Sequence, residues 1–505
     1  MVFHRIIAAP LAALLAVGAA ASVPEDTRGL VREMFPVAAQ VEAPTGDPPA
    51  MAVRDGAGGL LGYAFHTVDI LAIPAYSGKP IDSLVGLGTD GRIRGVEIVA
   101  HEEPILVIGL SDDDLHAFTR QYRGKTVAQD IGIGGRSTSE RQALDAISGA
   151  TITVMVINRA VTVAAQRVAD SRGIPFVAGG PDTGHGTAPA RAPPGPLWVE
   201  NWRTKVPYIA GLAAGLAVLL FILLFQDWVA RRARLLGVLR TAFLLYTVLF
   251  IGVIAHGQLS VVNVLTFTHS LLGDFSWQSY LIDPVMFILW GFVAFTILLW
   301  GRGVYCGWLC PFGALQKLAF QAARYFRLPQ WELPAVVHER LWALKYVLLI
   351  GLFGVSLHSL VLAQQLAEVE PFKTTFSLRF VRDWPFVVYA AGLLVLALFI
   401  PKPFCRYLCP LGAALTFPGR FRIFDWLRRR KECGRPCQIC AIECEVGAIK
   451  PTGEIIDTEC HYCLDCQVTY WNDRRCPPLV ARRKKLEKLS RSGSSDARSV
   501  AGDGG

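Results

Sequence analysis

Cysteine is missing from the first three-fifths of this 505-residue chain, because none of its 12 cysteines precedes Cys306. A chain that avoids thiols in one part and concentrates them in another is expected to span two redox compartments. Charged residues are also scarce, at 18% of the chain, whereas apolar residues make up 52%. This balance argues against a soluble protein and places the chain among membrane proteins.

Lysine and arginine are absent from residues 257–280, although the whole chain carries a net charge of +9. The basic residues gather in the segments 226–240 and 301–345, beside apolar stretches, where the positive-inside rule accounts for them. No helix-turn-helix or zinc-finger pattern is present, so nucleic-acid binding is not expected.

Residues 1–22 have the pattern of a secretory signal peptide, in which a basic start is followed by an apolar run and small residues. An uncleaved anchor is the alternative, although the run is short for a membrane span. Residues 23–178 are then expected to form an exported α/β domain, with a hairpin whose strands 81–88 and 92–99 flank a Thr-Asp-Gly turn. Residues 179–200 are rich in Gly and Pro and predict a flexible linker.

The motif DAISGAT ends at Thr151 and is followed by apolar residues at helical spacing, which predicts a helix that starts at this Thr. The free N–H groups of a helix start favour phosphate, although an ordinary N-cap is the alternative. The motif resembles the flavinylation motif of FMN-binding domains, whose last Thr carries FMN through a phosphoester bond made by a flavin transferase. The resemblance implies covalent FMN on Thr151, with Asp145, Ser148, Gly149 and Ala150 as further FMN-binding residues.

Residues 201–425 contain five apolar stretches near the length of a membrane span, namely 206–225, 235–256, 284–300, 346–366 and 384–400. We therefore expect a five-helix transmembrane bundle, with the N-terminal domain and the C-terminus on opposite sides. His256, His269 and His358 lie near its outer side, where haem or quinol binding competes with the ordinary interfacial role of histidine.

A motif C-x3-C-P-x-G-A occurs twice, each time after an apolar stretch, and its cysteines are Cys306, Cys310, Cys405 and Cys409. Cysteines four residues apart share one helix face, and the Pro and Gly that follow break the helix. Four thiols are thus expected to converge near the cytosolic surface, as a further iron–sulfur centre or as redox thiols. The alternative is a set of buried cysteines without a ligand, and the type of metal is left open.

Residues 426–480 hold eight cysteines at spacings that resemble two-cluster bacterial ferredoxins, in which the fourth Cys of one run serves the other cluster. The resemblance implies two [4Fe–4S] clusters, the first held by Cys433, Cys437, Cys440 and Cys476 and the second by Cys460, Cys463, Cys466 and Cys444. Three residues separate the first two cysteines, where two are usual. Zinc sites and a disulfide framework are the alternatives. Residues 481–505 are basic and predict a disordered tail near the anionic inner membrane surface.

Taken together, the segment 257–291, both C-x3-C-P copies, the sequence EPFKTT at 370–375 and the cysteine-rich tail resemble the NosR/NirI family over about residues 55–480. Its members are membrane flavo-iron–sulfur proteins that support nitrous oxide respiration. The resemblance implies a multi-pass protein of the bacterial inner membrane, with a periplasmic flavin domain and a cytoplasmic C-terminus.

As a member of such a family, the chain would act as an electron-transfer protein rather than a conventional small-molecule enzyme. It would take electrons from quinol or a cytosolic donor and pass them to periplasmic nitrous oxide reductase. It would also affect expression of the reductase, because the family was first labelled regulatory. A redox sensor that controls transcription and a ferredoxin-type quinol dehydrogenase are the alternatives.

Overall fold

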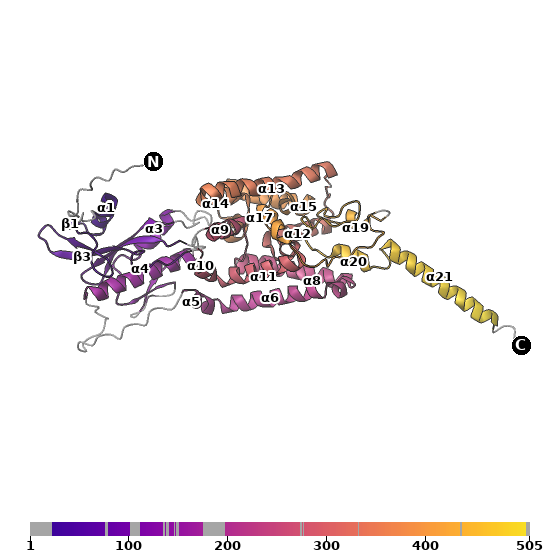
Figure 1. The fold of residues 1–505 in the computed structure, drawn as a ribbon, viewed down its shortest axis with the longest axis horizontal. Helices are drawn as coiled ribbons and strands as arrows, with labels where there is room; N and C mark the ends of the chain where they lie inside the picture. The colour runs from indigo at the N-terminus through magenta and orange to yellow at the C-terminus, as the bar shows by residue number, and fades with distance from the viewer. Residues whose placement is uncertain are drawn as a thin grey trace, which may run out of the picture. The chain divides into compact units, whose positions relative to one another are not determined.

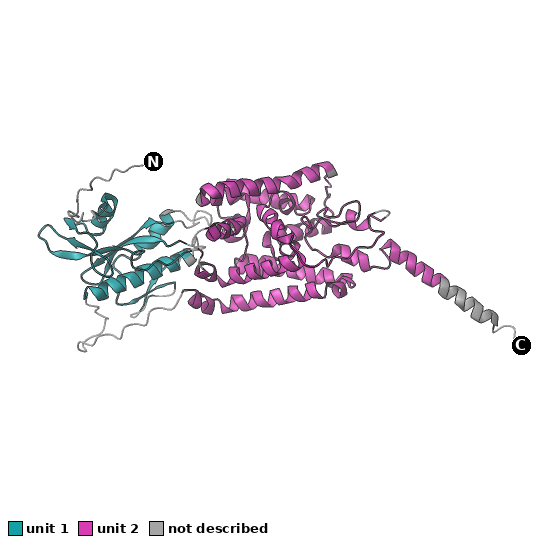
Figure 2. Cartoon of the chain, in the orientation of Figure 1, with its two compact units in different colours: residues 1–75, 79–103, 111–187 teal, residues 76–78, 104–110, 188–505 magenta. Residues whose placement is uncertain are grey.

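The structure is a computed structural model that describes residues 23–75, 79–101, 112–134, 137, 141–145, 147, 151–174, 197–272, 275, 277–331, 333–434 and 437–500. The chain divides into two compact units, which are described one at a time (Figure 2). Unit 1 comprises residues 1–75, 79–103 and 111–187, and unit 2 comprises residues 76–78, 104–110 and 188–505. The predicted signal peptide, most of the predicted linker, and Ser148, Gly149 and Ala150 lie outside the described residues.

Unit 1 is built on a five-stranded antiparallel sheet in the order β1-β2-β3-β4-β5 (Figure 1). Its strands are β1 (Gln40–Val41), β2 (Met51–Arg54), β3 (Leu60–His66), β4 (Asp82–Gly88) and β5 (Ile93–Ala100). The predicted hairpin is confirmed, because β4 pairs with β5 across a turn in which Gly91 takes a positive φ of 70°. Only glycine adopts this conformation without a steric cost.

The rest of unit 1 consists of α1 (Glu25–Met34), α3 (Asp112–Arg120), α4 (Thr151–Ser171) and a parallel pair of strands, β6 (Asp130–Ile133) and β7 (Arg141–Leu144). Helix α4 starts at Thr151, as predicted, and packs against β4 and β6. Its residues Val154, Ile157 and Val161 are almost completely buried. Burial of such a side chain contributes about 1.5–3 kcal/mol, so this apolar face fixes the helix to the sheet.

The described part of unit 2 is helical (Figure 1). Its elements are α5 (Leu197–Thr204), α6 (Val206–Leu224), α7 (Gln226–Ala230), α8 (Ala233–Tyr246), η1 (Thr247–Ile254), α9 (Val261–Leu272), α10 (Trp277–Leu281), α11 (Pro284–Trp300), η2 (Tyr305–Leu309), α12 (Pro311–Tyr325), α13 (Ala335–His358), α14 (Leu360–Leu366), η3 (Ala367–Val369), η4 (Lys373–Ser377), α15 (Trp384–Phe399), α16 (Pro403–Tyr407), α17 (Pro410–Ala414), α18 (Thr416–Gly419), α19 (Ile439–Ile442), α20 (Asp465–Trp471) and α21 (Pro477–Val500).

Three stretches of unit 2 are helical, long and apolar enough to cross a membrane: Val206–Leu224, Ala233–Ile254 and Val336–His358. The predicted spans 284–300 and 384–400 coincide with the shorter apolar helices α11 and α15. The predicted span 346–366 is wrong in its limits, because the helix begins at Ala335 and the chain turns at Ser359, whose hydroxyl caps α14. A hydroxyl that binds the first N–H groups of a new helix stabilises such a break.

Two further predictions differ from the structure. Residues 257–280 were not among the predicted spans, but they contain the apolar helix α9, whose residues Val261, Val262 and Leu265 are buried. The prediction of a disordered tail is wrong up to Val500, because helix α21 continues from Pro477. Lys, Arg, Leu and Glu are good helix formers, and their density favours the helix although none of residues 477–488 is buried.

Candidate functional site

The four cysteines of the C-x3-C-P motifs lie in the interior of unit 2, where each is between 6% and 8% exposed. Their predicted position near the cytosolic surface of the membrane stays a prediction, because burial in the protein does not place them relative to a membrane. Cys310 and Cys409 occupy matching positions, because each caps a helix that has Pro at its first turn. The Cys310 sulfur accepts a hydrogen bond from the Gly313 N–H at 3.4 Å, and the Cys409 sulfur accepts one from the Gly412 N–H at 3.2 Å.

The two motif copies face each other. Gln316 of α12, which follows the first copy, donates to the Cys405 sulfur at 3.2 Å and accepts from the Phe404 N–H at 3.2 Å. Among the described residues, no three His, Cys, Asp or Glu side chains already form a single-ion site. Zn–S bonds of about 2.3 Å would require that tight grouping, whereas an iron–sulfur cluster spreads its thiolates around several iron atoms.

Two polar residues beside these thiols were missed by the sequence analysis. The Gln258 side chain approaches the Cys310 sulfur at 3.8 Å. The buried carboxylate of Glu370 accepts hydrogen bonds from the Ser260 hydroxyl at 2.6 Å, the Val261 N–H at 2.9 Å and the Leu411 N–H at 3.2 Å. One carboxylate thus satisfies the open N–H groups of α9 and α17 together, which fixes the second motif copy against α9. In the sequence, the signal for Gln258 and Glu370 was their place in the segments 257–291 and 370–375, which carry the family resemblance.

Buried cations surround the same region. The guanidinium of Arg302 donates to the Gly412 carbonyl at 2.9 Å and pairs with Glu459 at 3.4 Å. The ammonium of Lys345 pairs with the same carboxylate. The ammonium of Lys402 donates to the carbonyl oxygen of Cys306 at 3.1 Å.

The eight cysteines of the tail line two cavities. One cavity is lined by Cys433, Cys437, Cys440 and Cys476. The other is lined by Cys444, Cys460, Cys463 and Cys466, with Cys440 at its edge. Each cavity is thus lined by the four thiols that one [4Fe–4S] cluster needs, so the residues fit two clusters. Which thiol binds which cluster stays a prediction.

Backbone N–H groups already point at several of these sulfurs. The Cys433 sulfur accepts from the Arg430 N–H at 3.4 Å, and the Cys444 sulfur accepts from the Ala448 N–H at 3.3 Å. Hydrogen bonds to ligand sulfurs are one means by which a protein sets the potential of an iron–sulfur cluster. Burial raises the pKa of the Cys440 thiol, so a metal must displace its proton on binding.

The unusual three-residue gap before Cys437 has a structural explanation. Gly434 takes a φ of 105°, and its N–H donates to the Cys437 carbonyl at 2.8 Å. A side chain at this position would overlap the backbone of Thr452. The extra residue is therefore accommodated by a tight glycine turn, while residues 435 and 436 lie outside the described residues.

The second cysteine group of the tail packs directly against the first motif copy. The Trp308 indole N–H donates to the Tyr462 carbonyl at 2.9 Å. A side chain on Gly307 would overlap the carbonyl oxygen of His461, so the two backbones touch. The loop between Cys460 and Cys463 is thus seated beside Cys306 and is held further by an ion pair of 2.7 Å between Asp465 and Arg240 of α8.

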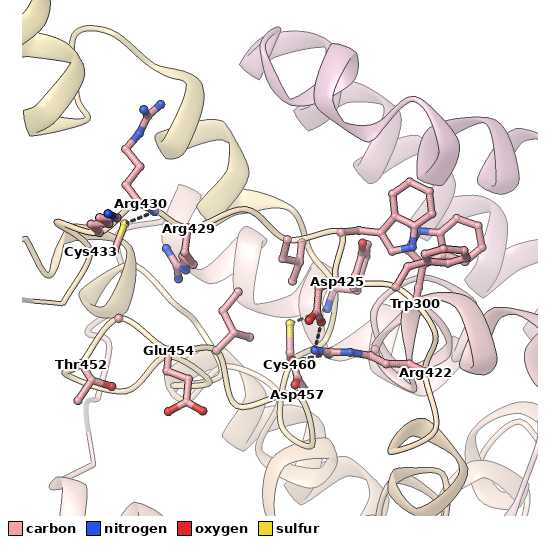
Figure 3. A pocket seen from close by; sticks show the side chains of 18 residues that line it. Trp300, Arg422, Asp425, Arg429, Arg430, Cys433, Thr452, Glu454, Asp457 and Cys460 are labelled. Atoms are coloured by element: carbon pink, nitrogen blue, oxygen red, sulfur yellow. Dashed lines mark hydrogen bonds and ion pairs between the residues drawn. The ribbon is translucent and has the colours of Figure 1, made fainter.

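A surface cavity reaches both cysteine groups of the tail (Figure 3). Its wall contains Cys433 from the first group and Cys460 from the second. Trp300, at the end of α11, stacks on Trp426 with ring centres 5.4 Å apart. In Figure 3, Arg422 points at both Asp425 and Asp457, with which it forms ion pairs. The cavity therefore combines aromatic and ionic groups at the edge of the apolar helices.

In unit 1, the described part of the DAISGAT motif is fixed at both ends. At its first residue, the Asp145 N–H donates to the Gln121 side chain at 2.7 Å. After it, Asn158 of α4 donates to the Ile131 carbonyl of β6 at 2.8 Å and accepts from Tyr122 at 2.9 Å. These contacts hold Thr151 at the helix start, where free N–H groups fit a phosphate.

A further polar pair lies at the end of β4. His66 forms a hydrogen bond of 2.7 Å with Asp82, and this bond raises the pKa of the histidine. Asp82 also lines a cavity at the ends of β4 and β5, together with Lys79, His101 and His116.

Comparison with known proteins gives three family matches. An FMN-binding domain matches residues 76–166, which contain the DAISGAT motif. A 4Fe-4S binding domain matches residues 282–329 and 383–432, which contain the two C-x3-C-P copies. A NosR model matches residues 431–487, which contain the eight tail cysteines.

The chain is also similar to whole proteins. Regulatory protein NosR of Pseudomonas aeruginosa is 36% identical over 94% of this chain and 96% of its own length. Protein NirI of Paracoccus denitrificans is 50% identical over 59% of this chain and 44% of its own length. The putative electron transport protein YccM of Escherichia coli is 27% identical over 36% of this chain and 52% of its own length.

Proposed function

Because the chain belongs to the NosR/NirI family, we propose that it is a membrane flavo-iron–sulfur protein that conducts electrons for nitrous oxide respiration. Electrons would enter at the two cysteine groups of the tail, pass through the C-x3-C-P region and leave from FMN on Thr151. Periplasmic nitrous oxide reductase would accept them, and quinol or a cytosolic protein would donate them. The cofactors supply the one-electron chemistry, and the chain supplies their placement.

The observation that carries this proposal is the direct packing of the Cys460–Cys463 loop against the first C-x3-C-P copy. The Trp308–Tyr462 hydrogen bond and the backbone contact at Gly307 leave no room for water or another side chain between them. The hydrocarbon core of a membrane is about 30 Å thick, so electron transfer across it needs intermediate stations. Buried thiols next to a cluster loop supply a place for one.

The named residues would have distinct roles in such a carrier. Thr151 would hold FMN covalently, with Asp145, Ser148, Gly149 and Ala150 around its phosphate, after attachment by a flavin transferase. The two groups of tail cysteines would each hold a [4Fe–4S] cluster. The cavity of Figure 3 would admit the electron donor, since its wall includes a cysteine of both groups.

The proposal includes a definite orientation of the chain in the membrane. The proposed carrier has its flavin domain in the periplasm and its tail in the cytoplasm, and it spans the inner membrane with five helices. The basic segments 226–240 and 301–345 favour this orientation by the positive-inside rule. Reporter tags at residues 100 and 450 would test it, and tags that face the same compartment would contradict it.

The variant Thr151→Ala tests the proposal in cells. We expect nitrous oxide reduction to be lost while the reductase protein is still made, because the path would end before the acceptor. Thr151→Ser keeps a hydroxyl at the same place and serves as the matched control. Mass spectrometry of the peptide that bears Thr151 supplies the direct readout, and absence of an added FMN mass in the wild-type chain would contradict the flavin assignment.

A second function is favoured by the name of the relative from Pseudomonas aeruginosa, which calls that protein regulatory. In this reading the chain senses redox state and controls transcription of the reductase genes. The same Thr151→Ala strain separates the two. Loss of the reductase transcript, with nitrous oxide reduction restored when the reductase is expressed from an independent promoter, would favour sensing over conduction.

A further inference from the structure

Three cations are buried beside the C-x3-C-P cysteines with too few anions to balance them. Arg302 is 2% exposed, Lys345 is fully buried and Lys402 is 2% exposed. Arg302 and Lys345 share a single carboxylate, that of Glu459. Among the residues that the structure describes, Lys402 pairs with no carboxylate and meets only the carbonyl oxygen of Cys306. Three positive charges against one negative charge leave an excess of two.

The other charges of this region do not remove the excess. Two further cations are already paired, Arg240 with Asp465 and Lys317 with Glu445. Arg406 is bound by His338 and by no described carboxylate, while Glu370 accepts only uncharged donors. These last two have opposite signs, so together they add no net charge to the count.

An unpaired charge inside an apolar bundle is strongly unfavourable, so such residues persist only where an opposite charge meets them. The backbone of Lys402 adds to this argument. Its φ of 49° lies in the left-handed region, which favours glycine and is strained for a side chain. The chain therefore holds an ammonium at a position where both its charge and its backbone are costly.

The nearest candidates for the missing negative charge are the four cysteines. Lys402 contacts the backbone of Cys306, and Arg302 contacts the carbonyl of Gly412, whose N–H binds the Cys409 sulfur. Neutral thiols or disulfides would supply no negative charge to Lys402, which has no described carboxylate partner. Four thiols that lose their protons to a metal core with two positive charges would carry two negative charges in total, which matches the excess.

We propose that Lys402, Arg302 and Lys345 are the counter-charge of an anionic metal–thiolate centre held by Cys306, Cys310, Cys405 and Cys409. The match of both copies to a 4Fe-4S binding domain favours iron and sulfide as the metal core. The inference rests on the proposed role of this region as an electron station. The three cations are positioning residues, because they set the charge around the centre without binding the metal themselves.

The test uses the full-length chain, purified anaerobically, and compares wild type with Cys405→Ala and Lys402→Met. For Cys405→Ala we expect a loss of iron and acid-labile sulfide relative to wild type, while the electron paramagnetic resonance signals of the tail clusters persist. For Lys402→Met we expect either loss of the same iron or a more negative midpoint potential of this centre. The expected size is a roughly tenfold fall in the equilibrium constant for one-electron reduction, about 59 mV.

Two variants control for packing. Lys402→Arg keeps the charge and should keep the wild-type potential. Lys402→Gln keeps a donor for the Cys306 carbonyl without the charge, and it replaces Lys402→Met if that variant does not accumulate. Equal iron and sulfide in wild type and Cys405→Ala would overturn the metal centre. An unchanged potential in both neutral variants, with metal retained, would overturn the counter-charge.

The outcome is independent of nitrous oxide reduction, since metal content and potential are measured without any acceptor. Zinc in place of iron at these cysteines would support the charge argument but remove this region from the electron path. Iron at these cysteines, together with a Thr151→Ala strain that still reduces nitrous oxide, would leave the centre intact and refute the conduction route to FMN.

Discussion

The variant Gly307→Ala should separate the tail loop from the C-x3-C-P region without removing any cofactor ligand. The added methyl group would overlap the carbonyl oxygen of His461 and lie 3.0 Å from its carbonyl carbon. Because non-bonded carbon atoms rest at about 3.5–4.0 Å, the loop must retreat by on the order of 1 Å. That movement also breaks the hydrogen bond between Trp308 and the Tyr462 carbonyl.

The cost follows from the two contacts. Forcing an extra methyl group into a packed interior typically costs about 1–3 kcal/mol, and the lost hydrogen bond costs about 1 kcal/mol more. The better helix propensity of alanine returns up to about 1 kcal/mol. We therefore expect a net loss of roughly 1–3 kcal/mol in the docking of the loop, which weakens this contact without unfolding the chain.

Two measurements report the result. Hydrogen exchange of peptides that cover residues 459–465 should become faster, and reduction of FMN by a soluble quinol should become slower in stopped flow. Gly303→Ala forms a graded partner, because its methyl group would lie 2.6 Å from the Cys460 carbonyl oxygen. Gly354→Ala in α13 is the matched control, since its methyl group would meet nothing within 4 Å.

The reasoning fails if Gly307→Ala retains full iron and FMN, shows faster exchange of the loop, and still reduces FMN at the wild-type rate. Such a result would mean that electrons do not pass through this contact. An equal slowing in Gly354→Ala would show instead that any alanine in the membrane helices disturbs the protein.

The remaining predictions concern the Asp465–Arg240 ion pair, the His66–Asp82 hydrogen bond and the proposed cluster ligand Cys433. Asp465→Asn should leave the buried Arg240 without its anion, and removal of one partner of a buried pair costs about 3–5 kcal/mol. Because the Asp465 side chain is 45% exposed, we expect the lower end or less, seen as faster hydrogen exchange of α20. The hydrogen bond to Asp82 raises the pKa of His66, so its stabilisation is complete below the ordinary pKa of about 6.5 and is lost as pH rises through the folded value. Exchange of β3, corrected for its intrinsic pH dependence, should therefore accelerate from pH 5 to 8 in wild type and not in His66→Gln. Cys433→Ala should lower iron by about four atoms per chain and leave the second tail cluster, whereas loss of both clusters would contradict the grouping of the cysteines.

Local patterns were sufficient to predict several elements. The β4–β5 hairpin followed from a Thr-Asp-Gly turn between apolar strands, and the start of α4 followed from the spacing of Val154, Ile157 and Val161. These features depend on neighbours in the sequence, and their physics acts over a single turn. The ligand sets of the tail cysteines came only from their resemblance to two-cluster ferredoxins, and they stay a prediction.

Other features could not be predicted because they depend on partners far away in the chain. Glu370 looks like an ordinary loop carboxylate until α9 and α17 bring their N–H groups to it. Lys402 looks like an interfacial lysine until the fold buries it beside Cys306. By hydropathy alone, the apolar run continues through Ser359. The chain turns at this residue, so the predicted span began and ended too far along the sequence.

The tail also has a consequence for how the protein matures. Tyr462 and Leu464 belong to the same apolar core as α6 and α11, and the Tyr462 hydroxyl donates to Gln226 at 2.9 Å. The ribosome makes this segment after the apolar helices, yet those helices rely on it to close their interior. A chain that lacks its metal-filled tail is thus an unfinished membrane protein, exposed to proteolytic removal. Its abundance in the membrane should follow the supply of iron and sulfide in the cell.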